Sequence, residues 1–100
     1  LFFSNYDKLE EHYTKHVIEK MEFGKKITQI EYVNKANKLL SSKVGGNIQG
    51  FTNKLGYTFR YNTKLNEFGI INNKGEIMTF FKPETGITYY NEQVLKYGGL

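Results

Sequence analysis

The pattern of apolar residues changes once along this chain, at Gly45-Gly46, and this change limits the fold more than any other feature. Before it, apolar residues recur at the i, i+3, i+4 and i+7 spacing of a helix face. After it, short β-branched and aromatic runs are separated by turns rich in Gly and Asn. We therefore predict an α+β domain, and its 100 residues suffice for a single modest core, so one domain should span residues 1–100.

Two helices are predicted in the first half of the chain. The first runs over about residues 6–21, with Ser4 or Asn5 as its cap, and its expected apolar stripe is Tyr6, Leu9, Tyr13, Val17 and Met21. The second runs over about residues 29–40 and begins at a capping box made by Thr28 and Glu31. We expect this second helix to bury Ile30, Val33, Ala36, Leu39 and Leu40.

Strands are predicted throughout the second half. The candidate strands are residues 48–53, 57–62, 67–72, 76–82 and 87–91. Their short connections favour an antiparallel meander. The expected fold is thus two N-terminal helices packed on one face of a twisted antiparallel sheet of about four to five strands.

The composition excludes several classes of protein. A hydrophobic content of 39% and an aromatic content of 16% are typical of a folded domain. The chain has no cysteine, which excludes disulfides and thiolate metal sites, and no stretch approaches the roughly twenty apolar residues of a membrane span, so no membrane anchor is expected. The net charge of +4 is compatible with an RNA or DNA partner, although a merely soluble basic surface would carry the same charge. The start at Leu1 suggests the C-terminal domain of a longer polypeptide.

Basic and titratable side chains gather on the first predicted helix. Lys8, His12, Lys15 and His16 follow the i, i+4, i+7, i+8 spacing of one helix face. A histidine exchanges protons near neutral pH, and a neighbouring lysine favours bound phosphate, so Lys15-His16 suggests cleavage of a phosphodiester. His16 falls at the margin of the apolar stripe, where one ring nitrogen would stay reachable, whereas His12 and Lys8 are expected progressively closer to solvent.

These residues also have structural interpretations. His16 can be a histidine fixed at the rim of the core. His12 and His16 have a spacing that suits zinc, but no convincing third ligand is present, so no metal or other cofactor is predicted. Arg60, the only arginine, can hold a phosphate through two hydrogen bonds, or it can pair with Glu67 or Glu76 across strands.

Several segments resemble the nuclease domain of colicin D. In the helical half these are residues 11–16, which contain Lys15-His16, and the following Phe23-Gly24. In the second half, residues 59–62, 67–72 and 75–82 are similar to the final strands of that domain. They are also similar to the wider class of RNase toxins that includes barnase, colicin E5 and RelE-like folds. Such domains are often the C-terminal toxins of contact-dependent inhibition and other polymorphic toxin systems.

The resemblance implies roles for individual residues. The catalytic histidine of the family falls on His16, and its neighbouring lysine falls on Lys15. The strand serine that contacts the scissile phosphate falls on Thr79, and the tryptophan near it falls on Phe81, which has no indole N–H. Arg60 is added as a second cation for the phosphate. The candidate contacts to RNA are His12, Lys8, Lys82 and Tyr90.

The function that the resemblance implies is that of a toxin ribonuclease. It would cleave RNA, tRNA above all, by metal-independent transesterification to a 2′,3′-cyclic phosphate and a 5′-hydroxyl. The expected partners are tRNA and a cognate acidic immunity protein, with a host translation factor as a further candidate. The domain would be secreted or delivered from the cell surface within a larger protein and would act in the cytoplasm of the target cell. The residues leave open a non-catalytic nucleic-acid or protein-binding module, and also a metal-dependent DNase.

Overall fold

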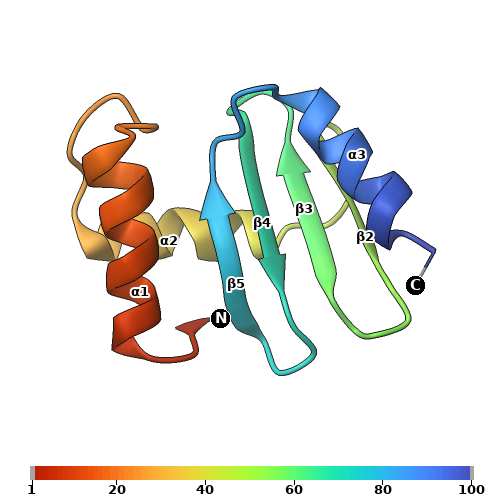
Figure 1. Ribbon diagram of the computed structural model, residues 1–100. Coiled ribbons are helices and arrows are strands. Elements are labelled where there is room, and N and C mark those ends of the chain that lie inside the picture. Colours follow the sequence, from red (N-terminus) through yellow and green to blue (C-terminus); the bar gives the residue numbers. More distant parts are fainter. Residues whose placement is uncertain (1, 100) are drawn as a thin grey trace.

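A computed structural model describes residues 2–99 of the chain as an α+β domain (Figure 1). One five-stranded sheet has the order β1-β5-β4-β3-β2, in which β1 is parallel to β5 and the other pairs are antiparallel. In chain order the elements are β1 (Phe2–Phe3), α1 (Tyr6–Tyr13), η1 (Thr14–Glu19), α2 (Gln29–Leu40), β2 (Ile48–Thr52), β3 (Thr58–Asn62), β4 (Glu67–Ile71), β5 (Glu76–Phe81) and α3 (Ile87–Tyr97). The α+β class and the four strands β2 to β5 confirm the prediction.

The first helix changes its winding halfway along. Asn5 caps it by accepting a hydrogen bond from the Lys8 N–H (2.9 Å), but from Thr14 to Glu19 it is a π-helix, η1. A π-helix has more residues per turn than an α-helix, so a stripe drawn at α-helical spacing drifts off the buried face. The predicted stripe is correct at Tyr13 and Val17, which are buried, but wrong at its ends, because Tyr6 and Met21 are 61% and 59% exposed.

The second helix has the predicted bounds. Its capping box is present, with Thr28 N–H donating to Glu31 Oε1 (2.9 Å) and Glu31 N–H donating to Thr28 Oγ1 (3.1 Å). The predicted buried face is wrong at Ile30, which is 74% exposed. Tyr32 takes its place, since residues two apart point to nearly opposite sides of a helix at about 100° per residue. The buried positions of α2 are Tyr32, Ala36, Leu39 and Leu40.

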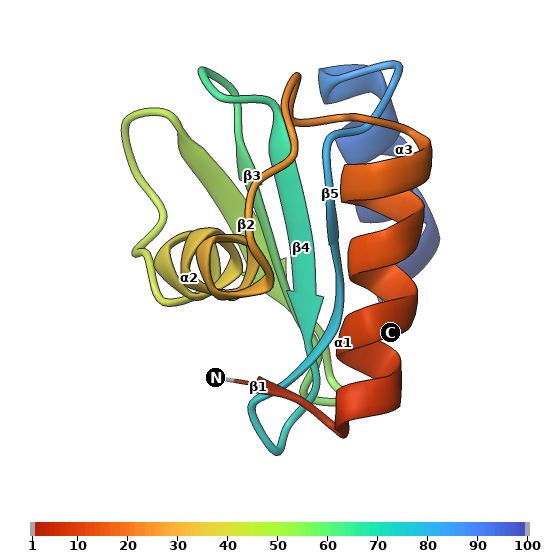
Figure 2. The same ribbon diagram turned by 90° about the vertical axis from the view of Figure 1, so that its left-hand side faces the viewer.

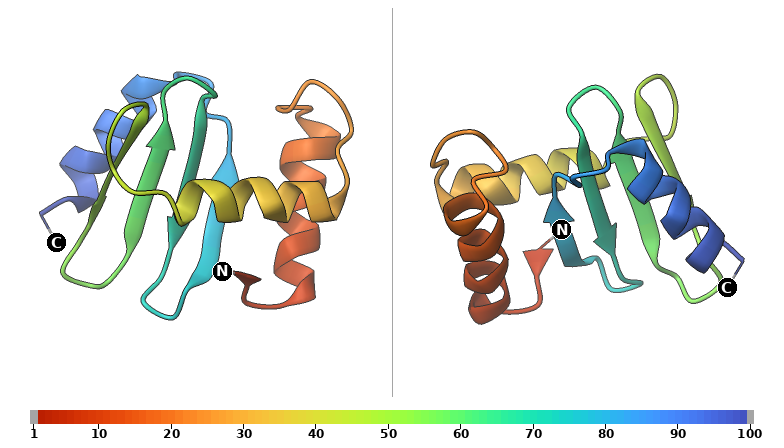
Figure 3. Two further views of the ribbon diagram at one scale, coloured as in Figure 1. Left: turned by 180° about the vertical axis from the view of Figure 1, so that it is seen from behind. Right: turned by 45° about the horizontal axis from the view of Figure 1, so that its top comes forward.

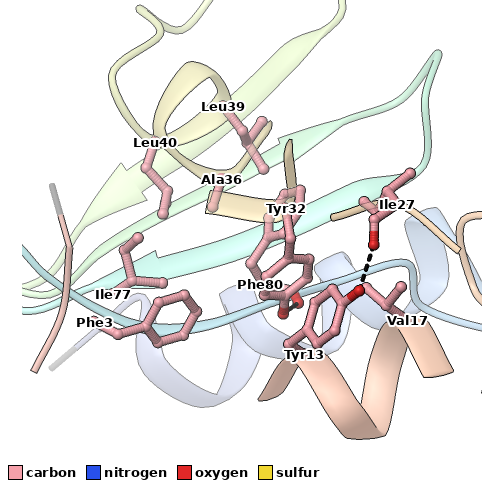
Figure 4. Packing of buried hydrophobic residues seen from close by; sticks show 10 residues of the cluster. All are labelled: Phe3, Tyr13, Val17, Ile27, Tyr32, Ala36, Leu39, Leu40, Ile77 and Phe80. Atoms are coloured by element: carbon pink, nitrogen blue, oxygen red, sulfur yellow. Dashed lines mark hydrogen bonds between the residues drawn. The ribbon is translucent and has the colours of Figure 1, made fainter. Parts of the chain in front are cut away.

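The core on the α2 side of the sheet is closely packed (Figure 4). Tyr32 and Phe80 are fully buried, and the Tyr32 hydroxyl donates to the Phe80 carbonyl (2.5 Å). Helix α2 approaches the sheet most closely at Gly69, which has no side chain. A Cβ atom there would lie 3.1 Å from a methyl carbon of Leu40. The hydrophobic face of α2 therefore lies directly on β4.

The last helix is the main departure from the prediction. Residues 87–91 were predicted as a strand, but Ile87–Tyr97 form α3, which follows Gly86 at a φ of 56°. The run Ile-Thr-Tyr-Tyr has high β propensity, yet helical spacing lets Tyr90 and Tyr97 pack on the sheet: Tyr90 stacks on Tyr61 and Tyr97 stacks on Phe59. Tertiary packing thus outweighs local propensity.

The helices consequently cover both faces of the sheet, and the prediction of a single covered face is wrong. Figures 2 and 3 show α2 on one side of the sheet and α3 on the other, while α1 stands beside β5 at the edge of the sheet. The core beneath α3 contains Phe59, Tyr61, Phe68 and Tyr90. The predicted all-antiparallel sheet is also wrong, because the two-residue strand β1 adds a parallel edge to β5. Within residues 2–99, no helix is long and apolar enough to cross a membrane.

Candidate functional site

His16 lies in η1 and packs against the end of strand β5. Its ring stacks on the ring of Phe81 at the end of β5, with centroids 5.1 Å apart and planes 14° apart. The residue is only 5% exposed, so it is buried more deeply than the rim position that the sequence predicted. The stack fixes the plane of the imidazole, which a proton-transfer group requires.

A carboxylate that the sequence analysis did not identify, Glu22, holds the inner edge of this ring. The helix η1 ends at Glu19, Met21 beyond it has a left-handed φ of 48°, and the Glu22 N–H donates to the His16 carbonyl (3.0 Å). This turn places Glu22 Oε2 2.8 Å from His16 Nδ1. The other oxygen, Oε1, accepts the backbone N–H of Lys82 (2.9 Å). Glu22 therefore joins the end of the first helix to the end of β5.

This pair determines which nitrogen of His16 is available for chemistry. With Glu22 ionised, Nδ1 carries a hydrogen and donates it, which leaves Nε2 with a free lone pair in the neutral ring. Among residues 2–99, only His12 Nδ1 and Asn37 Oδ1 are fully buried side-chain polar atoms that lack a partner. His16 Nε2 is not one of these atoms and makes no hydrogen bond in that part of the chain. The arrangement suits proton transfer at Nε2.

The structure brings Thr79 onto the same side of β5 as Phe81. Phe80 points into the α2-side core, so its neighbours Thr79 and Phe81 point to the opposite side, where η1 and α3 lie. Thr79 is half-buried and pairs with Ile70 of β4. Thr79 thus lies on the same side of β5 as the Phe81 ring on which His16 stacks.

Lysines stand on both sides of the pair of His16 and Glu22. Lys15 is exposed on η1. Lys82 contributes its backbone N–H to Glu22, while its ammonium group donates to the Leu65 carbonyl (3.0 Å) and lies 5.4 Å from the centre of the Phe23 ring. Lys8, about two turns earlier on the first helix, is exposed and forms an ion pair with Glu11 (3.9 Å).

His12 is less accessible than expected. It is half-buried between Phe3 (ring centroids 5.4 Å apart) and His16 (6.0 Å apart), and its Nδ1 is fully buried without a hydrogen-bond partner among residues 2–99. Burial lowers the pKa of His12 below its ordinary value of 6.5, and the neighbouring charge of His16 lowers it further. His12 is more exposed than His16, as predicted, but both side chains are less exposed than the sequence suggested.

Two of the predicted residues lie elsewhere. Arg60 is on the α2 side of β3, where its Nε donates to the Ser42 carbonyl (3.0 Å) and its Nη1 to the Phe59 carbonyl (2.9 Å). Tyr90 is 5% exposed, and its ring stacks on Tyr61 with centroids 5.6 Å apart. Both side chains are engaged in packing the sheet, away from His16, and a contact of either with RNA stays a prediction.

Sequence reasoning missed Glu22 because its position depends on two irregularities. Along a continuous α-helix, residues six apart point to different sides, so a carboxylate at this spacing is not a candidate partner of His16. The π-helix and the left-handed backbone of Met21 together turn the Glu22 carboxylate toward the His16 ring. A positive φ at a non-glycine residue is a recognised mark of functional sites, but it is visible only in the structure.

Within residues 2–99, no group of three or more His, Asp or Glu side chains could hold a metal ion. The chain does contain a histidine and a carboxylate in the geometry of a proton-transfer pair.

Comparison with known proteins gives one informative likeness. No protein-family model and no curated protein matches the sequence. Among solved structures, a chain from a ribonuclease from Escherichia coli complexed with its inhibitor protein has a similar fold, with a TM-score of 0.53 and 19% sequence identity. The likeness covers 92% of this chain and 99% of that chain. At this identity it establishes a shared fold.

Proposed function

We propose that this chain is a ribonuclease toxin domain that cleaves RNA, tRNA above all, without a metal ion. The observation that carries the proposal is the pair formed by His16 and Glu22, which orients the imidazole and leaves its Nε2 without a hydrogen bond among residues 2–99. The pair lies in a fold that a ribonuclease with an inhibitor protein shares. The sequence resemblance to RNase toxins independently assigns the proton transfer to His16.

The proposed reaction is a transesterification. His16 Nε2 takes the proton of the 2′-hydroxyl while the 2′ oxygen forms a bond to phosphorus. The bond from phosphorus to the 5′ oxygen breaks, and the leaving oxygen takes a proton from water, which yields a 2′,3′-cyclic phosphate and a 5′-hydroxyl. Thr79 and Lys15 would stabilise the charge that develops on the phosphate. Arg60 has no part in this scheme, because its guanidinium is bound to carbonyls on the other side of the sheet.

The proposal includes partners and a route of delivery. An RNase of this kind would kill its producer, so a cognate acidic immunity protein should cover the site, and the net charge of +4 would favour such a partner. A host translation factor is a further candidate partner. The domain would be secreted or carried at the cell surface within a larger protein and would act in the cytoplasm of the target cell.

Cleavage of bacterial tRNA in excess EDTA tests this function. The wild-type chain should cut RNA, leave DNA intact and produce ends that carry a cyclic phosphate, and sequencing of the new ends should give the cut site. His16→Ala should reduce cleavage by at least about 100-fold and retain affinity for RNA. Intact tRNA after incubation with the wild-type protein would favour the alternative, a non-catalytic binding module. Cleavage of DNA that EDTA abolishes would indicate a metal-dependent DNase.

A further inference from the structure

A hollow lies between α3 and the β2–β3 hairpin, on the side of the sheet to which Phe81 points. It has a volume of about 380 Å³, near the lower end of the range for ligand sites, a size that suits a single planar group. Phe59, which is 2% exposed, forms part of its lining, whereas Leu55 and Met78 are 62% and 42% exposed. The hollow therefore opens to solvent.

Its lining combines aromatic rings with a free amide. Tyr57 is half-buried and packs against the aromatic cluster beneath α3, but its ring forms no stacked or edge-to-face pair with another ring among residues 2–99, whereas the rings of Tyr89 and Tyr97 do. Gln93 also lines the hollow, and its amide makes no hydrogen bond within the described part of the chain. An unstacked ring beside an amide that can both donate and accept is suited to a nucleobase, which has a flat face and a polar edge.

The hollow is connected to His16 by a continuous series of side chains. The His16 ring stacks on Phe81, and the Phe81 ring meets Tyr89, which lines the hollow, with centroids 5.4 Å apart. Strand β5 makes the same connection: a β-bulge between Ile77 and Thr79 leaves Met78 as an extra residue, and Met78 lines the hollow too. An RNA strand held at His16 would thus have a base within reach of Tyr57 and Gln93.

We propose that this hollow binds one unpaired nucleobase of the substrate, with Tyr57 stacking on its face and Gln93 hydrogen-bonding its edge. This inference rests on the proposed ribonuclease function for the position of the base relative to the cut. It gives the domain a means of preferring one base near the scissile phosphate. A base can reach the hollow only from a single strand or a loop, because pairing would cover its edge.

Titration with the four ribonucleosides tests the site without any cleavage. Two-dimensional ¹H–¹⁵N NMR should show that the preferred nucleoside shifts the backbone signal of Tyr57 and the side-chain amide signals of Gln93. Gln93→Leu and Tyr57→Leu should each weaken binding about tenfold, the effect of losing one hydrogen bond or one stack. Gln49→Leu, an exposed position on β2 outside the hollow, is the matched control and should bind as the wild type does.

A cleavage assay separates this inference from the function it rests on. Short RNAs that differ only in the bases flanking the cut should be cleaved at unequal rates by the wild type and at more nearly equal rates by Gln93→Leu. The inference is overturned if no nucleoside shifts these signals at millimolar concentration, or if Gln93→Leu and Tyr57→Leu bind as Gln49→Leu does. Absence of all RNA cleavage by the wild type would overturn the proposed function instead, while the nucleoside titration would still decide whether the hollow binds a base.

Discussion

The two sides of the sheet are built from similar aromatic residues but differ in how completely these are covered. On the α2 side, Tyr32 and Phe80 are fully buried, and the one hydroxyl between them is bound to a carbonyl. On the α3 side, Tyr57 and Tyr89 are half-buried around a hollow, and Phe81 offers its face to His16. Both sides thus contain a buried core, since Phe59, Tyr61, Phe68 and Tyr90 are buried beneath α3, but the α3 side also has partly covered rings around a hollow.

Adjacent residues of β5 provide the most direct test of this difference, with the largest expected effect. Phe80→Ala should lower the free energy of unfolding by about 3–5 kcal/mol, because a fully buried ring leaves a cavity. Phe81→Ala should cost only about 1–2 kcal/mol, because its ring is half-exposed, but it should reduce RNA cleavage through the loss of the stack with His16. Urea unfolding followed by circular dichroism, with cleavage assays below the transition, measures both. Equal losses of stability would show that the two sides are not different in this respect.

Glu22 is the residue whose replacement should affect the open side most while sparing the fold. In Glu22→Gln, the amide oxygen can still accept the Lys82 N–H, but the NH₂ group then faces His16 Nδ1 and makes it an acceptor. The hydrogen moves to Nε2, and cleavage should fall about 100-fold, because the base is in the wrong tautomer.

The matched control for Glu22 is Glu19→Gln, at an exposed position of η1, which should retain activity. The ¹⁵N chemical shifts of the imidazole report the tautomer directly. Full activity of Glu22→Gln would mean that the carboxylate has a structural role alone.

Glu67 is a buried carboxyl residue on the α2 side of the sheet, and its replacement should stabilise the protein. It is 5% exposed, and burial raises its pKa above the ordinary 4.5, against the opposing charges of Lys82, Lys35 and Lys38. Between pH 4.5 and the raised pKa, Glu67 is therefore protonated in the folded state but ionised in the unfolded chain. The free energy of unfolding falls as the pH rises through this range.

Glu67→Gln should therefore gain on the order of 1 kcal/mol at pH 7 and little below pH 4. Thermal unfolding at several pH values measures this gain, with Glu84→Gln at an exposed loop position as the control. A destabilised Glu67→Gln at pH 7 would show that the carboxylate makes favourable contacts in its ionised form.

The smallest expected effect concerns His12, which lies where the two sides meet. Its pKa is lowered in the folded protein. Between pH 6.5 and the lowered pKa, His12 is therefore protonated in the unfolded chain but neutral in the folded one. Stability should decline by a few tenths of a kcal/mol or more as the pH falls from 6.5 to the lowered pKa. His12→Gln should remove this part of the pH dependence in the unfolding curves. A slope that persists unchanged in His12→Gln would assign it to another group.

The sequence was most informative where local signals act alone. The capping box at Thr28 fixed the start of α2, and turns rich in Asn and Gly fixed β2 to β5. It was least informative where packing decides the structure: the run at Ile87 has strand propensity but forms α3, because Tyr90 and Tyr97 cover the sheet. Similarly, His16 could be selected from residue type and resemblance, but Glu22 could not, because its placement depends on backbone winding that no side-chain pattern records.

Because η1 is a π-helix, the number of residues between Thr14 and Met21 determines whether Glu22 meets His16. Each residue in this segment sets the rotation of everything that follows it, and the wide winding accommodates more residues than an α-helix would over the same rise. Removing a single residue there would allow regular α-helical winding and rotate Glu22 away from the imidazole. Substitutions on its exposed side should be tolerated far better than insertions or deletions, so relatives that share this site should keep the number of residues in the segment even where they change the residues themselves.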